Sequence, residues 1–189
     1  MDQMEIRQLI ARQRAYFQSG ATLPARARVE ALRALRSAVA AREEELNDAL
    51  RADLGKSAFE SYMCEVGMVL SELTYMIRRT PAFAADRRVR TPLAQFAARS
   101  YAKPSPCGTV LIMSPWNYPL LLTLDPLIDA LAAGNTAVVK PSAYSPATSR
   151  VIARLLAECF PPEHVSVVTG GRQENACLLE QKFDYIFFP

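Results

Sequence analysis

Two polar side chains, Asn117 and Lys140, each come after a short apolar run that is typical of a buried β-strand. Residues 108–113 precede the loop that contains Asn117, and residues 136–139 end at Lys140. If these strands are parallel, their carboxyl ends lie at the same edge of a sheet, which is where open α/β sheets bind ligands. We therefore expect Asn117 and Lys140 to face one ligand site.

The two side chains offer different chemistry. The carboxamide of Asn117 has two N–H donors, and at the start of a helix, where the dipole favours negative charge, it could stabilise an oxyanion. Spacing alone favours a simple helix cap at this position. Lys140 could bind sugar hydroxyls or a phosphate, and the alternative is an ordinary solvated lysine. Trp116 either packs under a ligand or fills the core.

Other candidate groups carry weaker signals. Gly170 and Gly171 follow a third apolar run and allow close backbone approach, but their spacing is not that of the dinucleotide-binding fingerprint, and no P-loop is present. His164 is the only histidine, and nothing in the sequence places it near a cysteine, so we expect no thiol–imidazole pair. The cysteines include no closely spaced pair, which indicates four buried thiols in a reducing compartment and no metal site; they are Cys64, Cys107, Cys159 and Cys177.

Strands and helices alternate in the second half of the chain, which predicts a parallel α/β sheet. The apolar runs predict four strands, at 108–113, 136–139, 165–168 and 183–188. Helices are expected at 120–133, from Ser145-Pro146 to Pro161-Pro162, and at 173–181. Gly134 supplies the left-handed residue that ends the first of these helices.

The first half of the chain is predicted to be helical. Helices are expected at 4–18, from Thr22-Leu23-Pro24 to Gly55, and from a capping box at Ser57 and Glu60 to Pro81. Apolar residues recur at helical spacing in the last two, and in the third the stripe begins at Tyr62, so we interpret these faces as core. One further strand is expected around 95–102.

Composition indicates an ordinary globular chain. Of 189 residues, 50% are hydrophobic, and 22 Lys and Arg against 19 Asp and Glu give a net charge of +3. The first residues are acidic where a secretory signal is basic, and no apolar run approaches the ~18 residues of a membrane span. We therefore expect a cytoplasmic protein without a membrane span.

Arginines accumulate between residues 78 and 103, so nucleic-acid binding is an available alternative. The stretch lacks a reading helix and interleaved aromatic residues, and the overall charge is small. We interpret it as a solvated connection and expect no nucleic-acid partner.

Three ordered segments resemble the aldehyde dehydrogenase superfamily, in its class 3-like branch for fatty and aromatic aldehydes. They are SPWNYP at 114–119, DALAAGNTAVVKPS at 129–142 and VSVVTGG at 165–171. RADLGKSAFESYMCEV at 51–66 and FDYIFF at 183–188 extend the resemblance over essentially the whole chain. The chain is thus similar to the N-terminal portion of these enzymes.

The resemblance implies the fold class: α/β, with N-terminal helices and an incomplete parallel-sheet, Rossmann-like NAD(P)-binding domain. Residues 1–93 would form a helical layer, 94–103 a bridging strand and 104–189 four strand–helix units, with the catalytic domain absent. NAD or NADP is the implied cofactor, and the complete enzyme would be a homodimer.

The implied reaction is oxidation of an aldehyde to a carboxylate through a cysteine thioester, with hydride transfer to nicotinamide. By this resemblance Asn117 is the side-chain half of the oxyanion hole and Lys140 holds the adenosine ribose. The residues implied to line the cofactor cleft are Ser114, Pro115, Trp116, Ser142 and Gly170.

The sequence departs from the family at two points. Ala143 stands where the family often has a glutamate that accepts hydrogen bonds from the ribose, and our hypothesis is that NADP is tolerated because this carboxylate is missing. Family members are more than twice as long, and their general-base glutamate and nucleophilic cysteine follow the strand equivalent to 185–188. None of the four cysteines here matches that nucleophile, so we expect this chain alone to be inactive. The alternative is a non-catalytic binding or assembly remnant of the family.

Overall fold

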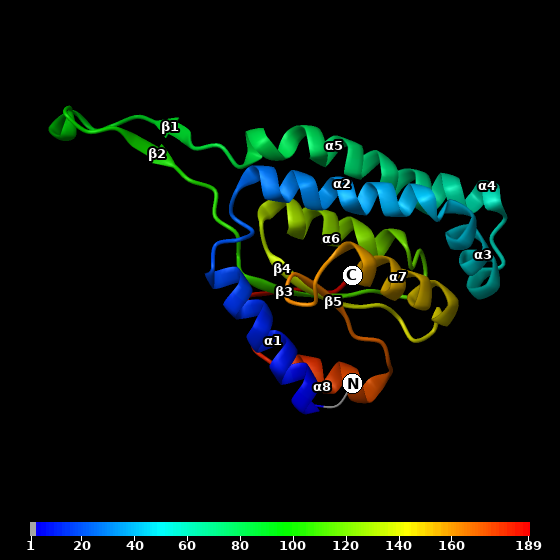
Figure 1. Ribbon diagram of the computed structural model, residues 1–189. Helices are drawn as coiled ribbons and strands as arrows, with labels where there is room; N and C mark the ends of the chain where they lie inside the picture. The colour runs from blue at the N-terminus through cyan, green and yellow to red at the C-terminus, as the bar shows by residue number, and fades with distance from the viewer. Residues whose placement is uncertain (1–2) are drawn as a thin grey trace.

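A computed structural model describes residues 3–189 and confirms the α/β class (Figure 1). The helices are α1 (Gln3–Gln18), α2 (Ala25–Ala41), α3 (Glu43–Leu54), α4 (Ala58–Ser61), the π-helical η1 (Tyr62–Val66), α5 (Gly67–Phe83), the 3₁₀ turn η2 (Leu93–Gln95), α6 (Leu121–Ala133), α7 (Pro146–Cys159) and α8 (Arg172–Leu179). The strands are β1 (Arg87–Val89), β2 (Ser100–Ala102), β3 (Thr109–Met113), β4 (Thr136–Lys140), β5 (Val165–Val167) and β6 (Tyr185–Phe187). Within the described residues no helix is both long and apolar enough to cross a bilayer.

The predicted strands of the second half form one parallel sheet in the order β5-β4-β3-β6. In the central pair, Met113 at the end of β3 lies opposite Lys140 at the end of β4. The carboxyl ends of both strands are therefore level, as the sequence predicted.

The sheet is covered on both faces, which explains why its central strands are apolar without alternation. Val110 and Ile112 pack into a core shared with α2, α3, α5, α6 and α7. Leu111 and Met113 point to the other face, where α1 and α8 lie (Figure 1). Helix α6 is sandwiched between the sheet and the helical layer, which accounts for its nearly continuous apolar sequence.

The single helix expected up to Gly55 is instead two helices, so that prediction is wrong. The chain breaks at Arg42, which has φ −116° and ψ 22°, and its N–H bonds to Val39 O rather than continuing the α-helical pattern. Three glutamates, Glu43 to Glu45, begin α3, and Arg42 pairs with Glu45 and Glu158. Charge at the new helix start and a partner on α7 favour the bend over a straight helix.

The helix expected after Ser57 is also interrupted. Ser57 caps its start as predicted, accepting a bond from Glu60 N at 3.2 Å, but a π-turn follows at η1. The extra residue in this turn rotates the helix face, so that Glu65 is fully buried while Tyr62, predicted to be core, is 43% exposed. Gly67 permits the turn, because a Cβ there would lie 2.8 Å from Tyr62 O.

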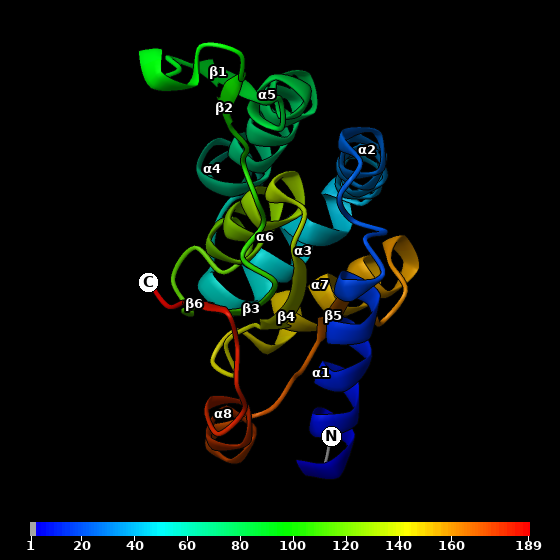
Figure 2. The same cartoon turned by 90° about the vertical axis from the view of Figure 1, so that its left-hand side faces the viewer.

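The strand expected at 95–102 is reduced to β2, which pairs antiparallel with β1, a strand that the sequence reading missed. Residues 93–95 form the 3₁₀ turn η2 instead. Figures 1 and 2 show this hairpin as an arm that projects from the body beyond α5. Its arginines are exposed, as expected for a solvated connection.

Helix α1 is fastened to the sheet by Gln13, whose amide donates to Ala137 O at 2.9 Å and Pro162 O at 3.1 Å. Beside it, the His164 ring at the start of β5 packs between Tyr16 and Phe160, with centroid separations of 5.6 and 5.5 Å. Burial lowers the pKa of His164 below its usual 6.5, although Glu163 opposes the shift. The fold therefore favours the neutral imidazole.

We predict that this histidine makes the fold less stable in mild acid. Above pH 6.5 its contribution is fully present, because His164 is neutral in both folded and unfolded chains. As pH falls below 6.5 the unfolded chain binds the proton first, and stability decreases down to the folded-state pKa. Urea unfolding between about pH 7.5 and about pH 5.5 should show this loss, and His164→Gln should flatten it. Equal slopes in both proteins would contradict the prediction.

Candidate functional site

The structure brings the loop after β3 and the end of β4 together. The backbone N–H of Ser114 donates to Lys140 O at 3.0 Å, which extends the β3–β4 pairing by one bond. Gly170 and Gly171 follow β5 on the other side of β4. Candidate residues from three neighbouring strands thus share one edge of the sheet.

Lys140 is buried, so its interpretation as a solvated lysine is wrong. Its side chain donates from Nζ to Pro141 O at 3.0 Å and to Gly170 O at 2.8 Å. Burial lowers its pKa, partly offset by the charge of Glu174. An ammonium has three donors, so one remains for a ligand.

Gly170 holds the loop that Lys140 contacts. Its φ of +136° is outside the range that side chains tolerate, and a Cβ there would lie 2.4 Å from Glu174 Cδ. Glu174 accepts a bond from Gly171 N at 2.7 Å at the start of α8. Hydrogen bonds from its own N–H and that of Gly171 lower the pKa of Glu174, so it is an anion facing the Lys140 side of the loop.

A cavity of about 270 Å³ opens at this edge. Its walls include four residues that the resemblance assigned to the cofactor cleft, namely Ser114, Lys140, Ser142 and Gly170, together with Ala143, Arg172 and Asn175. Two of its polar atoms, Ser114 Oγ and Asn175 Oδ1, are buried without a hydrogen-bond partner in the described part of the chain. A ligand with several hydroxyl groups matches these unpaired atoms and the free donor of Lys140.

Pro115, Trp116 and Asn117 lie on the loop between β3 and α6, beyond the walls of this cavity. Trp116 is 55% exposed and therefore does not fill the core. Asn117 is exposed and does not cap α6, because the cap position is Leu120. Its carboxamide is left available to a ligand.

The sequence reading missed Glu65 and Asp53, which satisfy the helix starts near this edge. Glu65 accepts from Leu120 N and Leu121 N at the start of α6, and Asp53 accepts from the first amides of α7. Both residues lie in the segment 51–66 that carried part of the family resemblance. That resemblance was the available signal, because hydrophobic periodicity does not single out either carboxylate.

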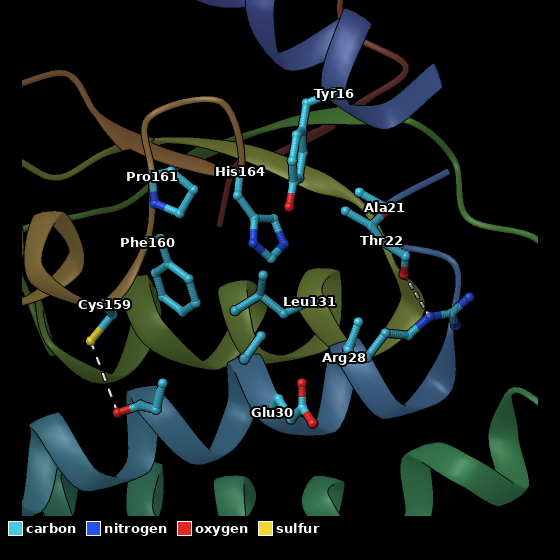
Figure 3. Close-up of a pocket in the computed structure, with 13 residues that line it drawn as sticks. Tyr16, Ala21, Thr22, Arg28, Glu30, Leu131, Cys159, Phe160, Pro161 and His164 are labelled. Atoms are coloured by element: carbon cyan, nitrogen blue, oxygen red, sulfur yellow. Dashed lines mark hydrogen bonds between the residues drawn. The ribbon is translucent and has the colours of Figure 1, made fainter. Parts of the chain in front are cut away.

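A second cavity, also of about 270 Å³, lies at the opposite edge of the sheet and contains both Cys159 and His164 (Figure 3). The sequence did not predict that these two residues line one cavity. They do not form a thiol–imidazole pair, as expected. Phe160 lies between them, and Cys159 Sγ contacts Ala34 O at 3.9 Å. Burial raises the pKa of the Cys159 thiol, which disfavours the reactive thiolate.

The prediction of four buried thiols is wrong. All four cysteines are free, but Cys107 is exposed and the other three are partly exposed. Cys107 precedes β3 and so lies at the opposite end of that strand from Asn117. Among residues 3–189 no group of three or more potential metal ligands is present.

Comparisons with known proteins agree on one family. Residues 1–188 match the aldehyde dehydrogenase family. The chain is 43% identical to Homo sapiens aldehyde dehydrogenase family 3 member B1, over 95% of this chain and 38% of that protein. It is 38% identical to a dimeric NADP-preferring aldehyde dehydrogenase of Canis lupus familiaris, over 97% of this chain and 41% of that protein.

A solved structure gives the same result. The substrate-bound state of Staphylococcus aureus AldH matches with a TM-score of 0.94 at 39% identity, over 97% of this chain and 40% of that chain. The chain thus spans well under half the length of the relatives that it matches.

We predict that Gly170→Ala destabilises the fold by about 1–3 kcal/mol, because alanine is strained at φ +136° and its Cβ would also displace the Glu174 carboxylate. Gly171→Ala is the matched control, since a Cβ there meets nothing within 4 Å, and it should change stability by less than about 0.5 kcal/mol. Urea denaturation of both variants checks the difference. Similar effects of the two substitutions would show that the loop tolerates a side chain at Gly170.

Proposed function

The chain belongs to the aldehyde dehydrogenase family, and on that premise we propose that it is the N-terminal part of an enzyme that oxidises an aldehyde to a carboxylate with NAD or NADP. The observation that carries the proposal is the cavity at Lys140, where a buried ammonium keeps one donor free beside unpaired hydroxyl and amide oxygens. In the proposed reaction the substrate passes through a cysteine thioester.

The residues present fit the adenosine end of a nicotinamide cofactor. We assign the ribose hydroxyls to Lys140, with Ser114, Ser142 and Gly170 lining the cleft and Pro115 and Trp116 closing it from the loop. The bound cofactor supplies the acceptor for the hydride. The protein's own part is to hold the ribose on a rigid strand end, because the lysine is fixed by two carbonyls.

Asn117 is proposed as the side-chain donor that stabilises the oxyanion of the reacting aldehyde. Its carboxamide is exposed and does not serve the helix, so it is available for the negative charge that develops on the carbonyl oxygen. The loop carries it at the same sheet edge as Lys140, one strand away.

Binding of the cofactor tests the assignment of Lys140. Isothermal titration calorimetry of the 189-residue chain should detect binding of NAD. Lys140→Met should lower the affinity for NAD at least about tenfold. Lys103→Met, which removes an exposed lysine on the arm, is the matched control and should leave binding unchanged. Loss of affinity in both variants, or in neither, would contradict the assignment.

We further propose that NADP is accepted. Ala143 places no carboxylate in the cavity wall, and Arg172 lines the same wall with a cation suited to a 2′-phosphate. The Canis lupus familiaris relative that prefers NADP supports this reading. Affinities for NADP and NAD should agree within about tenfold, and Ala143→Glu should weaken NADP selectively. A strong preference of the unmodified chain for NAD would overturn the proposal.

The chain alone is proposed to be inactive. The proposed reaction requires a cysteine thiolate beside the oxyanion site that attacks the aldehyde. None of the four cysteines matches the family's nucleophile. A pure sample given aldehyde and NAD or NADP should produce no reduced cofactor, as measured by its fluorescence. Production that disappears when one of these cysteines is replaced would show the proposal to be wrong.

The remaining assignments follow from the family. We divide the chain into a helical layer (1–93), a bridging segment (94–103) whose only strand is β2, and four strand–helix units (104–189), with the β1–β2 arm crossing the first boundary. Exposed apolar side chains on the arm, such as Leu93 and Phe96, support a subunit contact in a dimer. Four free thiols support a reducing, cytoplasmic compartment.

A non-catalytic binding or assembly remnant is the second candidate function. Cofactor binding at Lys140 without turnover is common to both candidates, and they differ in whether a longer, active polypeptide contains this chain. The intact mass of the native product decides between them, because a mass near 20.9 kDa favours the remnant.

A further inference from the structure

Glu65 occupies an unusual position for a carboxylate, because its side chain is completely buried between the helical layer and the sheet domain. One oxygen, Oε1, accepts from Lys56 Nζ at 2.5 Å. The other, Oε2, accepts from Leu120 N at 2.8 Å and Leu121 N at 3.1 Å. The buried charge is thus balanced by an ammonium and by the positive end of α6.

The same group of residues shapes the loop before α6. Lys56 Nζ lies 4.1 Å from the centre of the Tyr118 ring, which is a cation–π contact. Tyr118 has φ +50°, a left-handed conformation that a tyrosine adopts only when its surroundings impose it. This strained residue is the immediate neighbour of Asn117.

The loop is held at its start by the sheet and at its end by Glu65 and Lys56. Ser114 N is tied to Lys140 O at the sheet, and Leu120 and Leu121 are tied to Glu65. Asn117 itself is exposed and is not hydrogen-bonded through its side chain within residues 3–189. Its location therefore depends on the two anchors.

Resting on the function proposed above, we infer that Glu65 is the positioning residue for Asn117. By fixing the first turn of α6 and, through Lys56, the conformation of Tyr118, Glu65 holds the carboxamide where an oxyanion forms. A misplacement of about 1 Å at such a donor costs on the order of a hundredfold in rate, so the anchor matters for function as well as for folding.

The π-turn at η1 orients the Glu65 side chain toward the interior. With a Gly67 N–H bonded to Tyr62 O across five residues, the helix gains one residue per turn and Glu65 turns inward. A regular α-helix would continue the stripe that begins at Tyr62, and that residue would then face the core instead. Glycine at position 67 is needed because a side chain would meet Tyr62 O.

The merely structural explanation is that Glu65 is one more helix cap, and Asp53 provides the comparison. Asp53 accepts from Ala147 N at 3.0 Å and Thr148 N at 2.7 Å, so it caps α7 with the same chemistry. Within residues 3–189 its side-chain hydrogen bonds go to α7 and not to the loop that carries Asn117. Removing either carboxylate should weaken the fold, whereas removing Glu65 alone should release the loop.

Trp116 makes the test direct, because it is the only tryptophan and it precedes Asn117. We would measure its fluorescence anisotropy decay and acrylamide quenching in the 189-residue chain, in Glu65→Gln and in Asp53→Asn. Glu65→Gln should increase the fast local motion of Trp116 and its quenching. It should also make amide exchange at Leu120 and Leu121 at least about tenfold faster. Asp53→Asn should leave all of these unchanged.

Equal Trp116 motion in the two variants would overturn the inference and leave Glu65 as a cap only. If Glu65→Gln does not fold, Lys56→Met decides, since it removes the ion pair and the ring contact while the carboxylate keeps its bonds to α6. A more mobile Trp116 in that variant supports the inference, and an unchanged one overturns it. No cofactor or aldehyde is present in these measurements, so they test the positioning of the loop alone. The proposed function is tested separately, by the cofactor titrations described above.

Discussion

A buried carboxylate at the start of α6 is the constraint around which the two halves of the molecule are fitted together. Glu65 comes from the helical layer, and the amides that it accepts from belong to the sheet domain. A charge in this position is tolerated only when it is fully matched, because desolvation is costly. The match requires Lys56, the π-turn and the start of α6 to be in place together, so these features depend on one another.

The same solution recurs along the edge of the sheet that carries the site. The first turns of α6, α7 and α8 receive carboxylates from Glu65, Asp53 and Glu174 respectively. Free helix starts bind phosphates in the common dinucleotide folds, and here the protein's own anions take those places. This agrees with the absence of a glycine-rich fingerprint from the sequence.

Lys140 shows how a single side chain joins strand and loop. It ends β4, it is buried, and it binds two backbone carbonyls, one of them beyond β5. Gly170 gives this loop its shape, because its φ of +136° suits a residue without a Cβ. The two candidate side chains differ in their freedom. Lys140 is fixed by two hydrogen bonds, whereas Asn117 is exposed to solvent.

Local patterns were sufficient for much of this protein. Apolar runs predicted four parallel strands, and Gly134 and Pro146 bounded the helices between them, because burial on both faces and backbone stereochemistry act within a few residues. The order of these strands also placed Asn117 and Lys140 at one edge. Tertiary structure alone decided the break at Arg42, the π-turn that buries Glu65 and exposes Tyr62, and the pairing of β1 with β2. The β1–β2 pair is a hairpin of short, exposed strands that carry no apolar pattern. The break and the π-turn depend on partners distant in the chain, Glu158 for Arg42 and Leu120 for Glu65. A charge becomes buried only when such a partner neutralises it.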